Sequence, residues 1–393
     1  MTSTPDLYRK FLACTGVSTD TRQITPGCLF VALKGDTFDG NQFALQALTA
    51  GARFVVVDDA AIAAQHQHCL LVTDGLTALQ DLARHHRQTL TIPVIGLTGS
   101  NGKTTTKELI AGVLSKRFSV YATYGNLNNH IGVPLTVLSL NDTHELAVVE
   151  MGANHQQEIA LLCTIAQPTH GLITNVGKAH LDGFGGVAGV RKGKGELYDY
   201  LAQTGGTVFI NSRDQTLTAM YRERLKTLRP ETTFAETVFY PGDPVELLQE
   251  SPVVMYRTNT GQAVTTHLPG RYNFENMLAA LAVGHYFGVS DAEANHAVAD
   301  YNPTNNRSQV VTHGSNTILL DAYNANPSSM AAAVQQFTRQ PATRKMVILG
   351  DMYELGSESK AEHAALGKLV ADGHFDVVVL AGQDMKWALG ALP

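Results

Sequence analysis

The segment PVIGLTGSNGKTTT, residues 93–106, decides the class of fold, because an apolar run meets a glycine-rich turn and a helical pattern there. VIGL predicts a buried strand, and KTTTKELIAGVLSKRF predicts the helix that follows the turn. A glycine-rich turn between a strand and a helix directs successive backbone N–H groups toward a phosphate chain. In such a loop Lys103 would reach the β- and γ-phosphates of a nucleotide, and the hydroxyl of Thr104 would bind Mg²⁺.

The spacing of this loop departs from the common form G-x-x-x-x-G-K-T, because residue 97 is Leu and the glycines are Gly96 and Gly99. The alternative interpretation is a glycine-rich turn that only caps a helix. We favour phosphate binding because the strand, the run 102–104 (GKT) and an apolar helix coincide.

Strand-like and helix-like segments alternate on both sides of this loop, which predicts an α/β fold with parallel sheets covered on both faces. At about 150 residues per domain, a chain of 393 residues contains two to three domains. Pro93 and the polar passage before it place one boundary near residue 90, and YNPTNNR places a second near residue 302. We therefore expect a small α/β N-terminal domain (1–89), a central P-loop domain with a parallel sheet (90–302) and a C-terminal domain (303–393). Between residues 214 and 269 the pattern is irregular and Thr-rich, which predicts several antiparallel strands.

Composition excludes several other classes of protein. The net charge is −6, with 29 basic and 35 acidic residues, which argues against binding to a nucleic-acid backbone. No apolar stretch approaches the ~20 residues that cross a bilayer, and the N-terminus lacks the apolar core of a signal peptide. The four cysteines are scattered, as in reduced proteins. We expect a cytoplasmic monomer without nucleic-acid partners or stable membrane insertion.

Two polar residues follow strands near the glycine-rich loop. Glu150 ends the strand in VVEMGAN, where a carboxylate at the carboxyl edge of a parallel sheet can bind Mg²⁺. An ordinary strand-end acid would be the better interpretation if the phosphate loop were absent. His180 follows GLITNVG, and its imidazole could bind a metal or position an acyl phosphate; a single loop histidine is usually just solvated. The pairs His66/His68 and His85/His86 are expected on the surface.

Lys194 lies in GVRKGKGELYDY beside Arg191 and Lys192. The ordinary interpretation of such a run is a solvated or phosphate-facing basic patch. The alternative is a lysine of lowered pKa, which can react with CO₂ to give a carbamate and so provide an anionic oxygen ligand for Mg²⁺.

Amide and charged side chains near the second linker are further candidates. Asn273 and Asn276 lie at i,i+3 at the start of the helix predicted from NFENMLAALAVGHYF, where amides can bind an adenine edge or cap the helix. For Asn273 the cap is favoured. Asp321 follows a predicted strand and could bond a ribose hydroxyl, and Arg307 before that strand could pair with phosphate. A turn residue and a surface cation are equally good interpretations of these two.

Taken together, these segments resemble the Mur ligase family of ATP-dependent amide ligases. The segments that carry the resemblance are TGSNGKTTT (98–106), GNLNNHIGVPLT (125–136), VVEMGANHQQEI (148–159), NVGKAHLDGFG (175–185), KGE (194–196), GRYNFENMLAA (270–280) and DAYNANPSSM (321–330). Within the family, the MurF branch is the most similar; the segments concerned are STDTR (18–22), PGCLFVALKGDTFDG (26–40), GNLNNHIGVP (125–134) and GDMYELG (350–356).

The resemblance implies an activity, substrates and cofactors. Members of that branch add D-alanyl-D-alanine to UDP-N-acetylmuramoyl-tripeptide through an acyl phosphate, using ATP and Mg²⁺, during synthesis of peptidoglycan precursors. Two alternatives stay open: the branch that adds the third residue, diaminopimelate or lysine, and a catalytically silent nucleotide-binding protein.

The resemblance also assigns roles to residues. The catalytic residues it implies are Lys103, His180 and Lys194. Those for ATP are Thr98, Gly99, Ser100, Asn101, Gly102, Lys103, Thr104, Thr105, Asn273, Asn276, Arg307 and Asp321. Those for metal are Thr104, Glu150, His180 and Lys194. Those for the uridine diphosphate end of the substrate are Ser18, Asp20, Thr21, Arg22, Lys34 and Gly35. The other substrate-binding residues are Asn126, Asn128, Asn129, Tyr323, Asn324 and Asn326.

The C-terminal domain departs from the family pattern. In the family this dinucleotide-fold-like domain continues with further strands and helices and a Lys-Gly-Ser-Arg phrase, whereas about 90 residues follow the second linker here. We therefore expect a shortened C-terminal domain, either from truncation of the gene or as a natural feature of this lineage.

Overall fold

The computed structural model describes residues 1–227, 232–242 and 244–392. The chain divides into two compact units. The first comprises Met1–Gly96, Tyr121–Met151 and Ala160–Pro168, and the second comprises Leu97–Val120, Gly152–Ile159 and Thr169–Pro393. Parts of the expected central domain (228–231 and 243) and the last residue of the expected C-terminal domain (393) lie outside the described residues.

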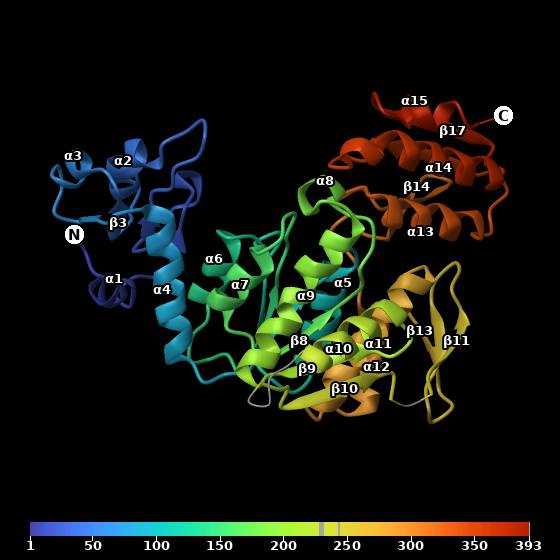
Figure 1. Ribbon diagram of the computed structural model, residues 1–393, viewed down its shortest axis with the longest axis horizontal. Helices are drawn as coiled ribbons and strands as arrows, with labels where there is room; N and C mark the ends of the chain where they lie inside the picture. The colour runs from blue at the N-terminus through green and yellow to red at the C-terminus, as the bar shows by residue number, and fades with distance from the viewer. Residues whose placement is uncertain (228–231, 243, 393) are drawn as a thin grey trace. The chain divides into compact units, whose positions relative to one another are not determined.

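The first unit begins with a parallel sheet of order β1-β2-β3-β4. The strands of this sheet are β1 (Val17–Ser18), β2 (Leu29–Val31), β3 (Phe54–Val57) and β4 (Cys69–Leu71). The helices of this part of the chain are α1 (Thr4–Phe11), α2 (Ala44–Thr49), α3 (Ala60–Ala63) and α4 (Gly75–Thr89) (Figure 1). Two 3₁₀ turns, η1 (Thr21–Gln23) and η2 (Gly40–Phe43), lie between them. The strands are short apolar runs, and their side chains form one core with small residues of α2. Asp74 begins α4 by accepting the backbone N–H of Thr77 at 2.7 Å, a standard N-cap.

His86 on α4 corrects a prediction. It was expected on the surface, but it is only 6% exposed, and its Nε2 lies 2.8 Å from the carbonyl oxygen of Leu140. Burial lowers the pKa of His86 below its ordinary value. The polar residues around it in the sequence do not reveal that its ring packs against Phe11 of α1 and bonds the Leu140 carbonyl, just beyond α6 (Gly132–Leu138).

Strand β5 (Val94–Thr98) belongs to both units, because the division falls after Gly96. In the first unit the strand order is β5-β7-β6, with β6 at Val120–Ala122 and β7 at Leu146–Glu150. Helix α7 (Glu158–Ala166) also begins in one unit and ends in the other. All five residues of β5 and of β7 are buried, as the uninterrupted apolar runs predicted.

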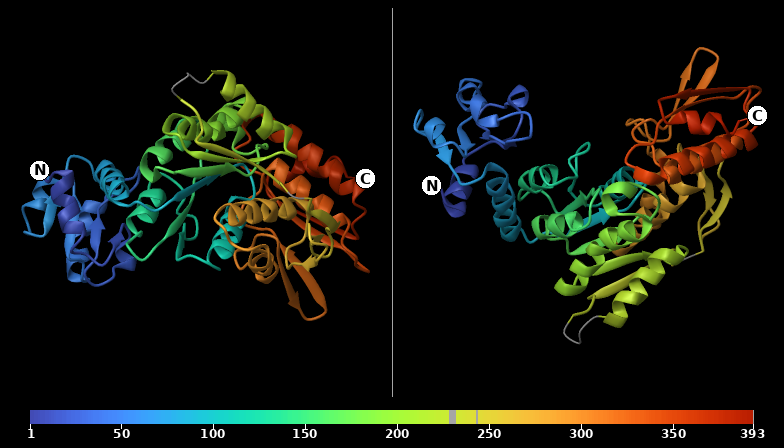
Figure 2. Two further views of the ribbon diagram at one scale, coloured as in Figure 1. Left: turned by 90° about the horizontal axis from the view of Figure 1, so that it is seen from below. Right: turned by 45° about the horizontal axis from the view of Figure 1, so that its top comes forward.

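In the second unit the order is β10-β9-β8-β5, and β8, β9 and β10 are parallel. The strands are β8 (His170–Ile173), β9 (Thr207–Asn211) and β10 (Glu236–Tyr240), and the helices are α5 (Lys103–Leu114), α8 (Leu181–Phe184), α9 (Val187–Thr204), α10 (Gln215–Thr227), α11 (Arg271–Tyr286) and α12 (Asp291–Asp300). The left view of Figure 2 shows these strands between α9 and α10 on one side and α5 and α11 on the other. Parallel strands covered on both faces confirm the α/β class expected from the sequence.

The segment between residues 214 and 269 is only partly antiparallel. The antiparallel strands β11 (Glu246–Gln249), β12 (Met255–Arg257) and β13 (Ala263–Thr265) confirm the prediction there. Residues 215–227, however, form α10, and β10 pairs in parallel with β9. The signal was present in the sequence: Asp214 caps the helix through the N–H groups of Thr216 and Leu217, and the apolar Leu217 and Met220 are buried one turn apart.

The last part of the second unit is a further α/β layer. It contains the antiparallel pair β14 (Gln309–His313) and β15 (Asn316–Leu320), the parallel pair β16 (Met346–Gly350) and β17 (Val377–Ala381), the helices α13 (Pro327–Thr338), α14 (Ser359–Asp372) and α15 (Met385–Leu389), and the turn η3 (Gly356–Glu358). Its core cluster also contains Leu181 and Phe184 of α8 and Val190 of α9. This layer is therefore packed on the loop and helices that follow β8. Throughout the described ranges, each helix is too short or too polar to span a bilayer.

Candidate functional site

The glycine-rich loop joins β5 to α5 with its backbone pressed against neighbouring elements. Gly99 has φ +148°, and a Cβ there would collide with Oγ1 of Thr174. Gly102 caps α5 with φ +78°, and a Cβ there would lie 2.6 Å from Oδ1 of Asn276. Only glycine fits both places, so the loop keeps its amides at the N-terminus of α5, as phosphate binding requires.

The residues after β8 brace this loop. The N–H of Asn101 donates to Oδ1 of Asn175 at 3.1 Å, and Nδ2 of Asn175 returns a bond to the Asn101 carbonyl at 3.0 Å. The hydroxyl of Thr174 also donates to that carbonyl, at 2.6 Å. Sequence reasoning missed Thr174 and Asn175. Their position at the carboxyl end of a strand next to the phosphate loop could have identified them.

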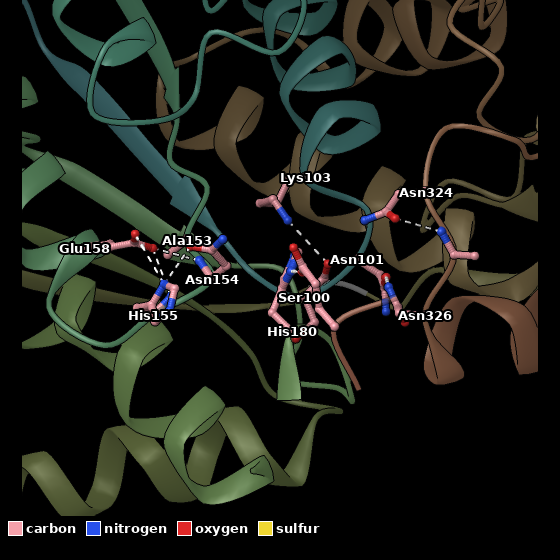
Figure 3. Close-up of polar contacts among 12 residues, drawn as sticks. Ser100, Asn101, Lys103, Ala153, Asn154, His155, Glu158, His180, Asn324 and Asn326 are labelled. Atoms are coloured by element: carbon pink, nitrogen blue, oxygen red, sulfur yellow. Dashed lines mark hydrogen bonds and ion pairs between the residues drawn. The ribbon is translucent and has the colours of Figure 1, made fainter. Parts of the chain in front are cut away.

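Lys103 folds back over the loop. Its Nζ donates to the carbonyl of Gly99 at 2.7 Å and to the carbonyl of Ser100 at 3.3 Å. Figure 3 shows the Lys103 side chain directed toward Ser100. Thr104 and Thr105 follow in the first turn of α5 and are 6% and 5% exposed. An ammonium group and hydroxyl groups are thus gathered at the helix N-terminus, and these groups suit a phosphate chain and a hard cation.

Glu150 lies in the first unit at the end of β7, where the sequence placed it, and is 1% exposed. Its Oε1 accepts Nδ2 of Asn128 at 2.8 Å. Asn129 instead accepts the N–H of Gly132, the first residue of α6, at 2.9 Å, and Asn126 is exposed. Among the described residues, there is no cluster of three or more His, Cys, Asp or Glu side chains that could hold a metal ion.

Lys194 is buried in the middle of α9. It is 1% exposed, its Nζ donates to the carbonyl of Ala153 at 2.9 Å, and the nitrogen lies 4.9 Å from the ring centroid of Phe184. Burial, and then the positive charge of Lys103, lowers the pKa of Lys194 well below its ordinary value. The solvated-patch interpretation was wrong for Lys194, because this residue lies on the same face of α9 as the buried Val190 and Tyr198, whereas Lys192 is exposed.

His180 precedes α8 in a left-handed conformation, with φ +53°. Its side chain is 26% exposed, and Nδ1 pairs with the carboxylate of Glu354. The loop that carries His180 is tied to the phosphate loop, because the hydroxyl of Ser100 donates to the Gly177 carbonyl at 3.1 Å and accepts the Gly177 N–H at 2.9 Å.

Asn273 and Asn276 are buried beside the phosphate loop, at 1% and 6% exposed. The cap interpretation of Asn273 was wrong: the N-cap of α11 is Gly270, and Nδ2 of Asn273 donates to the Pro269 carbonyl at 2.7 Å. Oδ1 of Asn273 accepts Nδ2 of Asn276 at 3.1 Å, and Oδ1 of Asn276 accepts the Thr106 hydroxyl at 3.1 Å. Both amides are therefore fixed in orientation by the helix that starts at the phosphate loop and by each other.

Of the candidate residues around β15 and α13, one contacts the phosphate loop and the others bond or stack within their own segment. The guanidinium of Arg307 stacks on the ring of Tyr323 at 3.7 Å, and Asp321 follows β15 as expected. Asn326 caps α13 and donates from Nδ2 to Oδ1 of Asn101 at 2.7 Å, so it contacts the phosphate loop directly. Asn324 instead accepts the N–H of Ala325 at 2.9 Å within its own turn (Figure 3).

The candidates for the uridine diphosphate end lie in the first unit, in two loops. In one, the carboxylate of Asp20 accepts the backbone N–H of Arg22 at 2.9 Å and its guanidinium at 2.8 Å, while the Ser18 hydroxyl donates to the Asp20 carbonyl at 3.0 Å; Thr21 begins η1. In the other, Nζ of Lys34 pairs with Asp58 at 2.7 Å.

Gly35 follows Lys34 in a tight loop, with its N–H donated to the Phe38 carbonyl at 3.0 Å. Both loops therefore hold a cationic side chain, Arg22 or Lys34, beside a carboxylate and at the surface.

A parallel α/β fold with a glycine-rich loop between β5 and α5 defines a nucleotide-binding protein of the P-loop class. Family models match the chain over three ranges. The Mur ligase middle domain matches residues 97–284, the Mur ligase glutamate ligase domain matches 306–391, and the Mur ligase family catalytic domain matches 13–87. The chain belongs to the Mur ligase family.

Individual relatives agree. The UDP-N-acetylmuramoyl-tripeptide--D-alanyl-D-alanine ligase of Bacillus subtilis (strain 168) is 37% identical over 373 residues, which cover 94% of this chain and 80% of that protein. The crystal structure of MurF from Acinetobacter baumannii superposes with a TM-score of 0.84 at 32% identity, over 99% of this chain and 88% of that one. MurF from Thermotoga maritima in complex with ADP gives 0.81 at 27% identity, over 96% and 87%. The resemblance to the family and its MurF branch is confirmed.

Proposed function

We propose that this protein is an ATP-dependent ligase that joins D-alanyl-D-alanine to UDP-N-acetylmuramoyl-tripeptide, a step in peptidoglycan precursor synthesis. The observation that carries the proposal is the phosphate loop with Lys103 folded over Gly99 and Ser100. It occurs in a chain that shares 37% of its residues, over 94% of its length, with a ligase of that name.

ATP and Mg²⁺ fit the residues present. The loop has no room for a Cβ at Gly99 or Gly102 and keeps its amides at the start of α5, which suits the phosphates. The hydroxyl of Thr104 and the carboxylate of Glu150 are the oxygen ligands that Mg²⁺ prefers. A nucleotide-bound Mg²⁺ takes one or two carboxylates and phosphate oxygens, so no larger cluster of acidic residues is needed. When bound, the ion would neutralise charge on the phosphates.

The chemistry requires two steps. In the first, the terminal carboxylate of the tripeptide attacks the γ-phosphorus of ATP, ADP leaves and an acyl phosphate forms; Lys103 stabilises charge on the transferred group. In the second, the amine of D-alanyl-D-alanine attacks the acyl carbon, inorganic phosphate leaves and the nitrogen loses its proton. Activation replaces an oxide leaving group by phosphate, which makes amide formation possible.

The proposal also includes a carbamate on Lys194. An amine whose pKa is lowered by burial is uncharged for more of the time and can react with CO₂, which a protonated lysine cannot. The resulting carbamate would place an anionic oxygen in a pocket that already contains a carbonyl, that of Ala153, and would compensate the nearby charge of Lys103.

The arrangement of domains follows the same proposal. Residues 1–89 would bind the uridine diphosphate end through the surface cations Arg22 and Lys34, residues 90–302 would bind ATP, and residues 303–393 would complete the site. Arg307, Asp321 and Tyr323 would lie on the nucleotide side, as the family resemblance implies. The cytoplasmic location and the monomeric state stay predictions from the sequence.

The test is the release of phosphate from ATP by the purified full chain. We expect release to require both UDP-N-acetylmuramoyl-tripeptide and D-alanyl-D-alanine. Release with the UDP-dipeptide and diaminopimelate or lysine would instead indicate the third-residue ligase, and ATP binding without turnover would indicate the silent protein.

A matched pair of variants tests the phosphate loop. Lys103→Ala is expected to abolish turnover while leaving binding of the UDP-substrate intact, because the lost group stabilises only the phosphoryl transfer. Lys116→Ala, an exposed lysine just beyond the same helix, is the control and should keep full activity. Full turnover by Lys103→Ala would contradict the assignment of the loop.

A further inference from the structure

The GDMYELG segment, residues 350–356, runs from the last residue of β16 to the first residue of η3. The carboxylate of Asp351 accepts the backbone N–H groups of residues 383–385 at 2.8 to 3.1 Å. The N–H of Met352 donates to Nε2 of His363 at 3.1 Å, and that histidine is fully buried. Two polar groups, the carboxylate of Asp351 and the ring of His363, thus hold the loop to the rest of the domain.

Two side chains at the tip of this loop point outward. Tyr353 is 75% exposed, and the Glu354 side chain is 49% exposed. Glu354 has φ +60°, a left-handed conformation that is costly for a residue with a Cβ; residues strained in this way cluster at functional sites. The backbone carbonyl of Glu354 accepts the N–H of Asp182 at 3.1 Å, which fixes the tip against the loop before α8.

The carboxylate of Glu354 faces the surroundings of the phosphate loop. It pairs with Nδ1 of His180, three residues after Gly177, and Gly177 exchanges two hydrogen bonds with the hydroxyl of Ser100. The path from Glu354 to the phosphate loop therefore consists of one histidine and one short, hydrogen-bonded segment.

Two other carboxylates of this region already bind a cation or backbone N–H groups. Glu362 pairs with Lys178, and Glu158 accepts the N–H groups of Asn154 and His155 at 2.7 and 2.9 Å. Glu354 differs from them because it is half-exposed and its partner is a histidine ring. It can bind a second, incoming group without losing a buried contact.

The incoming group is identified by the chemistry of amide formation, the second step of the proposed reaction. A dipeptide carries an α-amino group whose pKa is near 8, so it arrives mostly as an ammonium ion at neutral pH. Lys103 and Lys178 both lie in this unit near the phosphate loop, and positive charge there repels an ammonium ion. A carboxylate is needed to hold the amine close to the acyl phosphate.

We propose that Glu354 binds the ammonium group of the incoming dipeptide and orients its nitrogen toward the acyl phosphate. This inference rests on the proposed function, because it specifies the amine subsite of that reaction. It also gives a role to the GDMYELG motif, which the phosphate-loop chemistry leaves unused.

Hydroxylamine separates this inference from the function itself. It is a small amine that is largely uncharged at neutral pH and reacts with acyl phosphates to give a hydroxamate. With ATP and the UDP-tripeptide, the unchanged protein is expected to form the hydroxamate from hydroxylamine and the amide from D-alanyl-D-alanine. The absence of both products would overturn the proposed function and, with it, the subsite.

Glu354→Gln is the decisive variant. We expect it to raise the KM for D-alanyl-D-alanine about 10- to 100-fold, the range for loss of a charge-assisted hydrogen bond, while hydroxamate formation and the KM for ATP stay within about 2-fold. Glu354→Asp should recover part of the dipeptide affinity. Glu358→Gln, an exposed carboxylate that ends η3, is the control with the same change of charge and should behave as the unchanged protein.

Two results would overturn the inference. An unchanged KM for the dipeptide in Glu354→Gln would show that the carboxylate does not bind the amine. Equal loss of hydroxamate and amide would show that Glu354 acts on formation of the acyl phosphate, through His180 or the fold, instead of on the incoming amine.

Discussion

Lys34 in the first unit and Lys194 in the second are both candidate site residues, yet they lie in opposite surroundings. Lys34 is half-exposed and pairs with the buried Asp58 at 2.7 Å, and this hydrogen bond raises the pKa of Lys34. Lys194 is 1% exposed and contacts a carbonyl and an aromatic ring, and burial lowers its pKa well below the ordinary value.

The comparison shows that the surroundings of a lysine decide whether its amine acts as a cation or as an uncharged nucleophile. A lysine beside a carboxylate stays a cation and suits the diphosphate of a substrate. A buried lysine whose nearest contacts are neutral is driven toward the uncharged amine, which is a nucleophile. The predictions below test each half of this comparison and then the role of burial itself.

The largest effect is expected for Lys194→Ala. If Lys194 is carbamylated, the variant loses a charged group beside the phosphates, and kcat should fall by about 10³-fold or more, as for other losses of charge stabilisation in active sites. A carbonyl signal from ¹³C-bicarbonate should appear in NMR spectra of the unchanged protein and be absent from the variant.

Lys192→Ala is the matched control, because Lys192 is exposed on the same helix two residues away. It should keep both the activity and the ¹³C signal. Persistence of the signal in Lys194→Ala would assign the carbamate elsewhere, and loss of activity without any signal in the unchanged protein would leave Lys194 as a charged or packing residue.

A smaller effect is expected for Asp58→Asn. The carboxylate of Asp58 is 6% exposed; burial alone would raise its pKa, but bonds from Lys34, Asn41 and Gly75 outweigh this and lower it. Loss of the charge frees Lys34, so the KM for the UDP-substrate should rise about 10-fold, the cost of a charged hydrogen bond, while kcat and the KM for ATP stay within about 2-fold.

Asp36→Asn makes the same change of charge on an exposed residue of the Lys34 loop and should leave all three constants unchanged. A fall in kcat for Asp58→Asn at saturating substrate would argue against a binding role for the Lys34 loop.

The sequence predicted those parts of the site that depend on short segments. The phosphate loop, Glu150 at the end of β7 and Asp321 after β15 lie where strand ends and glycine positions placed them. Lys194 was different, because the letters around it are those of a solvated patch. Its burial follows from its place on α9, because Lys194 lies four residues after Val190 and four before Tyr198, on the same buried face of the helix.

Contacts between distant segments could not be predicted. Glu354 meets His180 across 174 residues, and Asn326 meets Asn101 across 225. Nothing local distinguishes these side chains from turn residues, since their partners are set by the packing of α13 and α14 onto the segments after β8. The same reason explains His86, whose ring contacts Phe11 of α1 and the Leu140 carbonyl, both distant from it in sequence.

His170 tests whether burial without a charged partner acts on another titratable group as it does on Lys194. The ring lies among Phe209, Tyr286 and Phe287, and burial lowers its pKa to about 4. The unfolded chain, with a pKa near 6.5, binds the proton first, so stability contributed by the neutral ring is complete above pH 6.5 and is lost as the pH falls toward 4.

At pH 5 this loss amounts to up to about 2 kcal/mol. Denaturant unfolding at pH 7 and pH 5 should therefore show a smaller difference for His170→Gln than for the unchanged protein. Equal pH dependence in the two would mean that the ring is protonated in the folded state, and that aromatic burial of this kind does not suppress charge.

The smallest effect is expected for Asp20→Asn, which removes the other carboxylate beside a candidate cation. Hydrogen bonds from Arg22 lower the pKa of Asp20, just as those from Lys34 do for Asp58, but the guanidinium of Arg22 is 87% exposed. Water and salt screen such a pair, and surface ion pairs contribute little to folding. The melting temperature of Asp20→Asn should match that of the unchanged protein, whereas Asp58→Asn should melt earlier because it disturbs a buried network with Asn41. If both variants melted at the same reduced temperature, the exposure of the Arg22 pair would not make it weaker than the Lys34 pair. The two ion pairs would then have to be distinguished by their geometry instead of by their burial.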